Sequence, residues 1–150
     1  MVSVKYNAVS KQYDDGFVAV DGLDLEIKDG EFLVLLGPSG CGKSTTLRML
    51  AGLEEVTHGE IEMDGVTVNH LPPGVRGLGM VFQSYALYPH MTIADNLSFG
   101  LRMAKGQSKL SGDEIKQRIQ EAAEMLDLVE HLDKKPKELS GGQRQRVALG

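Results

Sequence analysis

The spacing of hydrophobic residues changes at about residue 92 of the chain. Before that point, hydrophobic and polar residues alternate over 2–6 and 23–27, which is the period-two pattern of strands with one buried face. After it, hydrophobic residues recur every three or four positions, as in amphipathic helices. The pattern therefore predicts strands first and helices later, an order typical of a mixed α/β protein with a small helical subdomain.

Two further strands and two hairpins are predicted in the first part of the chain. The unbroken apolar runs 32–36 and 78–82 are typical of strands buried on both faces. Asp29-Gly30 predicts a hairpin into the first of these runs. Asp64-Gly65 predicts a second hairpin, which joins two short alternating segments.

Two amphipathic helices are predicted in the second part. Thr92 and Asp95 form a capping pair at the start of one, and its hydrophobic residues follow at four-residue spacing. The other spans 113–126, and the segment 105–112 between them has the composition of a loop.

Composition limits the kinds of partner that the chain can have. It has 150 residues, with 16 Lys and Arg against 21 Asp and Glu, so its net charge of −5 argues against general attraction to nucleic acid or to an anionic membrane. It has one cysteine, and its first residues lack the pattern of a signal peptide. No apolar run approaches the length of a membrane-spanning helix, which is about 20 residues. We expect a cytosolic protein, whose work at a membrane would need another chain to span it. The histidines, at 58, 70, 90 and 131, lack metal-ligand spacing and are interpreted as surface or packing residues.

A glycine-rich turn follows the apolar run 32–36 and precedes a helical segment. It fits G-x-x-x-x-G-K-[ST] and consists of Gly37, Pro38, Ser39, Gly40, Cys41, Gly42, Lys43 and Ser44. Glycines let successive N–H groups point inward, so the turn can hold the α- and β-phosphates of a nucleotide at a helix N-terminus. Lys43 supplies a cation for the β- and γ-phosphates, and the Ser44 hydroxyl is placed to ligate Mg²⁺. The motif and its flanking elements predict binding of a nucleotide with Mg²⁺, with a plain glycine-rich strand-to-helix turn as the alternative.

A second anion-binding site is predicted at LSGGQ, residues 139–143. Ser140 and Gln143 have the spacing of a helix cap, and the N–H groups of Gly141 and Gly142 can meet a phosphate with no Cβ in the way. A plain capped helix is the ordinary interpretation of such a match. Two glycines weaken the first turn, however, unless something approaches it closely.

Two more residues are candidates for nucleotide contact. Tyr13 could stack on a nucleobase, although core packing explains an aromatic residue at that spacing as well. Gln83 follows the run 78–82, at the strand end where open α/β sheets bind ligands, although an exposed glutamine there is also ordinary.

With GPSGCGKST, VFQ and LSGGQ in this order, the sequence resembles the nucleotide-binding subunit of an ABC transporter over all 150 residues. The resemblance implies a P-loop NTPase core with an antiparallel β subdomain and a helical subdomain. It implies that Tyr13 stacks on adenine and that Gln83 lies near Mg²⁺ and the γ-phosphate, with Lys43 and Gln83 serving hydrolysis and Ser44 and Gln83 the metal. The implied nucleotide contacts are Tyr13, Gly37 to Thr45, Gln83 and Ser140 to Gln143.

The resemblance also implies partners. Two copies would pair head to tail, so that the signature motif 140–143 of one closes over the γ-phosphate held by the other. The stretch 79–102 looks most like importers of maltose and other carbohydrates, where Gln83–Arg102 would receive the permease subunits, and a solute-binding protein would act indirectly. Within it the candidate contacts, for which packing is the alternative, are Tyr85, Leu87, Tyr88 and His90. The expected location is the cytoplasmic face of the cell membrane.

The family's Walker B strand, catalytic Glu and switch His all follow the signature motif, and none is present here. We therefore expect the core, 1–84 with 140–150, to be incomplete beside a helical subdomain at 85–139, and 1–150 alone to be inactive and poorly folded. The alternatives are an importer ATPase for polyamines or iron, a soluble ABC ATPase outside transport, and a non-catalytic nucleotide-binding module.

Overall fold

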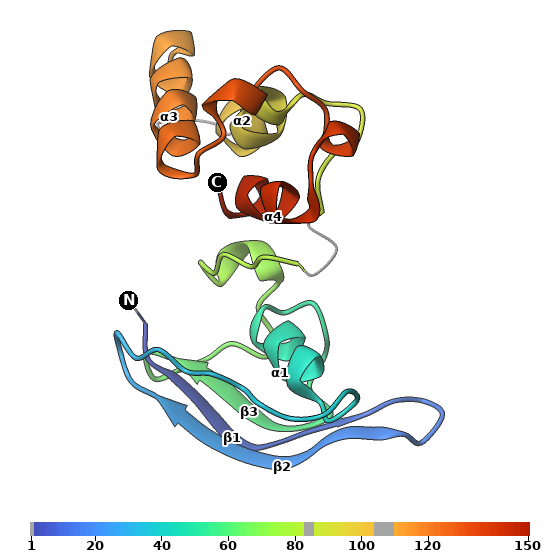
Figure 1. The fold of residues 1–150 in the computed structure, drawn as a ribbon. Coiled ribbons are helices and arrows are strands. Elements are labelled where there is room, and N and C mark those ends of the chain that lie inside the picture. The colour runs from blue at the N-terminus through green and yellow to red at the C-terminus, as the bar shows by residue number, and fades with distance from the viewer. Residues whose placement is uncertain (1, 83–85, 104–109) are drawn as a thin grey trace. The chain divides into compact units, whose positions relative to one another are not determined.

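The computed structural model describes residues 2–82, 86–103 and 110–150 (Figure 1). The chain divides into two compact units, Met1–Met80 and Val81–Gly150. Gln83 and Tyr85, as well as most of the predicted loop 105–112, lie outside the described residues.

An antiparallel sheet and one helix make up the first unit. Its elements are β1 (Val4–Gln12), β2 (Val18–Ile27), α1 (Lys43–Leu50), β3 (His58–Met63), β4 (Val66–Thr67) and the 3₁₀ turn η1 (Pro73–Val75). The strands lie in the order β2-β1-β3-β4, and every pair is antiparallel. The alternating patterns at 2–6 and 23–27 and the hairpin at Asp64-Gly65 are thus confirmed.

The core of this unit lies between the sheet and α1 (Figure 1). Tyr6 of β1 pairs with Leu25 of β2 and Ile61 of β3, and all three pack in one cluster with Met49 of α1. The Tyr6 hydroxyl donates to the Thr46 carbonyl of α1 over 3.3 Å, and burial raises the pKa of Tyr6 to about 12. The neutral phenol therefore fastens the helix to the sheet.

A bulge interrupts β1 at Ala8, whose φ of 47° lies in the left-handed region. The register with β2 shifts between Tyr6 and Val9, and Val9 is fully buried in the same cluster as Tyr6. Because an extra residue reverses which side chains face inward, odd-numbered residues after Ala8 take the buried side. Lys11 is one of them, with 9% of its surface exposed.

The predicted strands at 32–36 and 78–82, and the hairpin at Asp29-Gly30, are wrong for this structure. Asp29 and Gly30 form a turn, but 31–38 has no strand structure, and Phe32 and Leu36 are 89% and 87% exposed. A strand needs a hydrogen-bonded neighbour, and among the described residues no strand pairs with either run. The apolar pattern indicates a preference for burial, but it does not specify the neighbouring strand that pairing requires.

The described residues of the second unit form helices and no strand. The helices are α2 (Ile93–Met103), α3 (Gly112–Met125), α4 (Gly141–Leu149) and the 3₁₀ turns η3 (Val129–His131) and η4 (Pro136–Glu138). Their core contains Ile93, Ala123, Leu128, Leu139 and Val147.

The predicted helix starts in this unit are confirmed. Thr92 Oγ1 accepts from the Asp95 N–H at 3.1 Å, and the hydrogen bond from the Thr92 hydroxyl is the main cause of a lowered pKa at Asp95. Ser111 and Glu114 form a full capping box at α3. In α4, Val147 packs into the core of this unit, whereas the prediction that 140–150 belong with the core of 1–84 remains a prediction. Among the described residues, no helix is long and apolar enough to cross a membrane.

Candidate nucleotide-binding site

The turn 37–44 leads directly into α1. Gly42 precedes the helix in a left-handed conformation, with φ 89° and ψ −4°, and no side chain caps the first turn. That turn also contains no acidic residue. The N–H groups at the start of α1 are therefore open to an external acceptor, and the helix dipole favours an anion there.

Lys43 brings a positive charge into this turn. Its Nζ donates to the carbonyl oxygens of Gly37 and Pro38, each at 2.7 Å, and lies 3.3 Å from Cys41 Sγ. The ammonium thus lies against the residues that precede the helix. A compact charge on a flexible stem can exchange such carbonyl contacts for phosphate oxygens, to which its hydrogen bonds are stronger.

Two glycines of the turn leave no room for a side chain. A Cβ on Gly42 would come within 2.4 Å of the Ala19 carbonyl oxygen, and a Cβ on Gly37 within 2.6 Å of Cys41 Sγ. At Gly42 the contact is with the backbone, so the turn keeps this shape only with glycine there, whereas at Gly37 the contact is with a side chain that could shift. The structure thus fits the predicted phosphate cradle.

The remaining residues of the turn face solvent. Ser39, Gly40, Cys41 and Ser44 are exposed, and Thr45 is half-buried in the first turn of α1. A hydroxyl oxygen such as that of Ser44 is a ligand type that Mg²⁺ accepts beside phosphate oxygens. No group of three or more His, Cys, Asp or Glu that could hold a metal occurs among the described residues.

Tyr13 lies in the tight turn between β1 and β2, in the same unit as the glycine-rich turn 37–44, which we call the phosphate turn. Its N–H donates to the Phe17 carbonyl at 2.9 Å, and the two rings are nearly parallel, with centroids 6.3 Å apart. Tyr13 is half-buried and Phe17 is 56% exposed. An aromatic pair of this kind is suited to stacking on a base.

The signature motif opens α4 in the second unit. Ser140 Oγ accepts from the Gln143 N–H at 3.3 Å, and Gln143 Oε1 accepts from the Ser140 N–H at 2.8 Å. The predicted cap is confirmed, and it is a complete capping box. Gly142 is exposed, and a Cβ there would meet nothing within 4 Å. Packing among the described residues of this unit therefore gives no reason for a glycine at 142.

His131 of η3 supports this helix start, a contact that its spacing did not predict. Its Nε2 lies 2.8 Å from Gln143 Nε2, and its Nδ1 lies 3.0 Å from Lys134 Nζ. Because Gln143 Oε1 is used by the capping box, the amide nitrogen faces the ring, so both ring nitrogens face a donor, and a neutral imidazole can accept from only one of them. The interpretation of His131 as a packing residue is thus refined to a contact with the signature motif.

The segment before α2 combines packing with exposure. Leu87 packs against the core of the second unit, and the ring of Tyr88 lies 4.5 Å from that of Phe99 while 40% of Tyr88 stays exposed. His90 is exposed, with its ring 6.3 Å from Tyr88.

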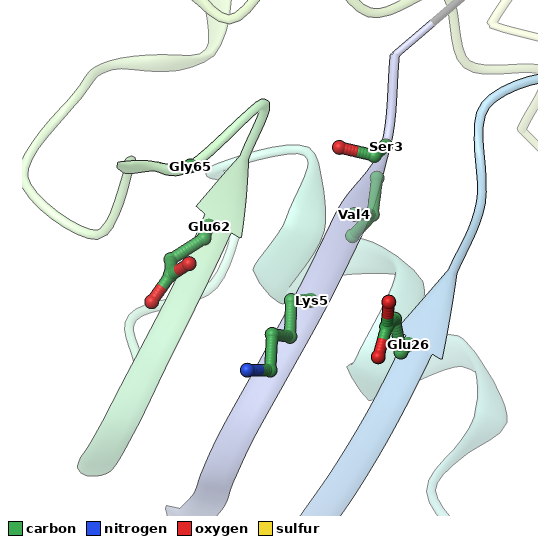
Figure 2. A pocket seen from close by; sticks show the side chains of 6 residues that line it. All are labelled: Ser3, Val4, Lys5, Glu26, Glu62 and Gly65. Carbon is green, nitrogen blue, oxygen red and sulfur yellow. The ribbon is translucent and has the colours of Figure 1, made fainter.

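A shallow pocket on the sheet contains none of the predicted site residues. It is lined by Ser3, Val4, Lys5, Glu26, Glu62 and Gly65 (Figure 2). In it Lys5 of β1 lies between its cross-strand partners Glu26 and Glu62. Such pairing of opposite charges stabilises a sheet surface.

Curated proteins with similar sequences are ATP-binding components of import systems. The diacetylchitobiose uptake system ATP-binding protein MsiK of Streptomyces coelicolor is 58% identical over 100% of this chain and 39% of its own length. The α-glucoside transport ATP-binding protein AglK of Rhizobium meliloti is 61% identical over 87% of this chain and 35% of its own. The maltose/maltodextrin import ATP-binding protein MalK of Photorhabdus laumondii is 53% identical over 100% and 39%. The chain thus spans little more than a third of these relatives.

Solved structures of ATP-binding cassettes share the fold. A dimeric cassette in a post-hydrolysis state, bound to ADP and Pi, matches with a TM-score of 0.86 and 36% identity, covering 97% of this chain and 67% of that one. The family model described as ABC transporter matches residues 20–150. With the phosphate turn, the capped signature helix and this match together, the chain belongs to the ABC transporter family.

Proposed function

We propose that the complete protein is the ATP-binding subunit of an importer, which binds and hydrolyses Mg-ATP to drive uptake of a carbohydrate. The observation that carries the proposal is the uncapped start of α1, where Gly42 is required by its backbone and Lys43 lies in the turn. Three relatives are named for uptake of sugars or glycosides, which supports a solute of that class.

Within the phosphate turn, the proposed roles follow from charge and donor type. The N–H groups of 40–45 would hold the α- and β-phosphates, and Lys43 would neutralise charge on the β- and γ-phosphates. Ser44 would hold Mg²⁺, with Gln83, which lies outside the described residues, close to the metal and the γ-phosphate. When bound, Mg²⁺ supplies a Lewis acid that lowers the charge of the transferring phosphoryl group. Lys43 and the turn then stabilise the charge that develops as water attacks.

At the signature motif, we propose contact with ATP held by a second copy of the subunit. The capping box leaves Gly142 exposed, with open space where a Cβ would be. Close approach by an external phosphate is a physical reason for a glycine there, since glycine in a helix costs about 1 kcal/mol relative to alanine. The solved relative bound to ADP and Pi is a dimer, which supports pairing of two copies.

The proposed location is the cytoplasmic face of the membrane, against permease subunits. The segment Gln83–Arg102 is the proposed contact, and the exposed part of Tyr88 and the exposed His90 support it. A solute-binding protein would deliver the carbohydrate on the other side.

The test is uptake of labelled carbohydrates by cells that contain the permease and lack this subunit. We expect the complete subunit to restore uptake of a di- or oligosaccharide and the Lys43→Ala variant not to restore it. Another relative, 55% identical, is named for import of sn-glycerol-3-phosphate. If uptake of that compound were restored instead, the proposed solute would be wrong, while the proposed ATPase role would stand. Uptake by the Lys43→Ala variant equal to that of the native protein would contradict the proposal.

A further inference from the structure

Lys11 is almost fully buried, although a lysine on a strand normally faces solvent. Its side chain is 11% exposed and is paired with Glu54, 22% exposed, with Nζ 2.8 Å from Oε1. Lys11 belongs to β1, and Glu54 follows the C-terminal end of α1. The pair therefore connects the strand that leads to Tyr13 with the helix that begins at the phosphate turn.

The bulge at Ala8 brings Lys11 to this position. Without an extra residue, the inward positions set by Val4 and Tyr6 would continue at even numbers and leave Lys11 on the opposite face. Ala8 is held in its left-handed conformation by hydrogen bonding of its N–H to Asp24 Oδ1, at 2.7 Å. Opposite the bulge, a Cβ on Gly59 would lie 2.4 Å from the Ala8 carbonyl oxygen, so glycine is needed there. The backbone is thus built to turn Lys11 inward.

Both members of the pair contact Tyr13. Lys11 Nζ lies over the Tyr13 ring, 5.0 Å from its centroid, and the Tyr13 hydroxyl donates to Glu54 Oε2 over 3.4 Å. The ring is therefore held at its face by a cation and at its tip by a carboxylate. The two contacts together favour one orientation of the ring plane.

We propose that Lys11 and Glu54 are positioning residues for base recognition, which hold Tyr13 in the orientation that stacks on the adenine of ATP. The inference rests on the proposed function, because it takes Tyr13 as the base contact. The orientation of Tyr13 is then set by the Lys11–Glu54 ion pair, whose glutamate follows α1. The ring that would contact the base and the phosphate turn therefore belong to one unit. Stacking on an aromatic residue is worth about 5- to 150-fold in affinity, and a misoriented ring forfeits part of it.

The experiment compares two ligands on the complete subunit by calorimetry with Mg²⁺ present: ATP, which has a base, and inorganic tripolyphosphate, which has none. We expect Lys11→Met and Glu54→Gln each to weaken ATP binding about tenfold and to leave tripolyphosphate binding unchanged. Lys11→Arg keeps the cation over the ring, and we expect it to restore most of the ATP affinity. Lys5→Met is the matched control, since Lys5 lies on the same strand between Glu26 and Glu62 (Figure 2) and precedes the bulge at Ala8 that turns Lys11 inward.

A second set of variants separates this inference from the proposed function. Tyr13→Ala should weaken ATP binding, and adding Lys11→Met to it should cause no further loss, because the lysine acts through the ring. An unchanged ATP affinity in Tyr13→Ala would overturn the base contact and this inference with it, while leaving the phosphate turn intact. A loss in Tyr13→Ala with none in Lys11→Met would overturn this inference alone. Equal losses for ATP and tripolyphosphate in Lys11→Met would show a structural role and overturn it too.

Discussion

The starts of α1 and α4 are both glycine-rich, yet they are built differently. At α1 the residue before the helix is Gly42 in a left-handed conformation, and no side chain caps the turn. At α4 the preceding residue is Ser140 in an extended conformation, and Ser140 and Gln143 close a full capping box. The first start leaves its N–H groups open, and the second satisfies part of them within the chain.

The difference extends to why each glycine is there. Gly42 is dictated by the fold, since its φ is 89° and a Cβ would meet the Ala19 carbonyl. Gly142 has no positive φ and open space around its missing Cβ. A glycine that the fold requires and a glycine that it does not require must be explained separately. The first shapes the turn, and for the second we propose the close approach of a phosphate held by another copy.

The largest effect in a test of this comparison is expected on the free energy of unfolding, when Gly42 is replaced. In Gly42→Ala, the left-handed backbone costs about 1–2 kcal/mol and the contact with Ala19 about 1–3 kcal/mol more, so we expect a loss of about 2–5 kcal/mol. Urea unfolding of the complete subunit measures it. Gly40→Ala is the control, since Gly40 has a similar φ of 84° but nothing within 4 Å of a Cβ, and it should lose only the backbone part.

Next in size is the loss of nucleotide affinity in Lys43→Ala. One or more charge-assisted hydrogen bonds disappear, each worth about 1.5–3 kcal/mol, so ATP should bind at least about tenfold more weakly. Calorimetry with ATP and Mg²⁺ checks this, with the exposed Lys28→Ala as the control. An affinity within twofold of the native value would remove Lys43 from the site.

Gly142→Ala sharpens the comparison, because stability and activity should move in opposite directions. Alanine favours a helix over glycine by up to about 1 kcal/mol and has room at this position, so α4 should become more stable. ATP hydrolysis by the complete subunit should nevertheless fall, because the methyl group occupies the path of the approaching phosphate. A variant that is more stable and fully active would show that 142 has no such role.

The sequence predicted the turns and the helix caps, because these features depend only on residues that are close together in the chain. The phosphate turn, the capping pair at Thr92 and the box at Ser140 each follow from a few consecutive side chains. The strand at 32–36 did not, because pairing depends on a neighbour that the pattern cannot supply. Lys11 could not be placed either, since one extra residue at Ala8 reverses the alternation, and a contact such as His131 with Gln143 joins residues twelve positions apart.

Ser140→Ala tests whether the cap of α4 also serves the site. Losing an N-cap serine costs about 1 kcal/mol, and the same loss is expected for Ser111→Ala at α3. The two variants are matched, because both serines belong to full capping boxes. We expect thermal unfolding to show similar losses, while ATP hydrolysis falls further in Ser140→Ala. Equal activity in the two variants would assign Ser140 to stability alone.

The smallest expected effect is a difference in pH response between the capping boxes of α3 and α4. Glu114 accepts from the Ser111 N–H at 2.7 Å, and this backbone hydrogen bond, followed by that of the Ser111 side chain, holds the pKa of Glu114 below its ordinary value of 4.5. Since the folded-state pKa is the lower one, the stabilisation is complete above 4.5 and is lost as pH falls through the folded-state value. Gln143 fills the same position at α4 with a neutral amide, so the box itself has no carboxylate to protonate.

An NMR titration below about pH 5 should therefore shift the backbone amide signal of Glu114 and leave the backbone amide signal of Gln143 unchanged, and Glu114→Gln should abolish the first shift. If both amides moved together in that variant, the caps would be responding to the unfolding of the whole unit, and the distinction between them would be lost.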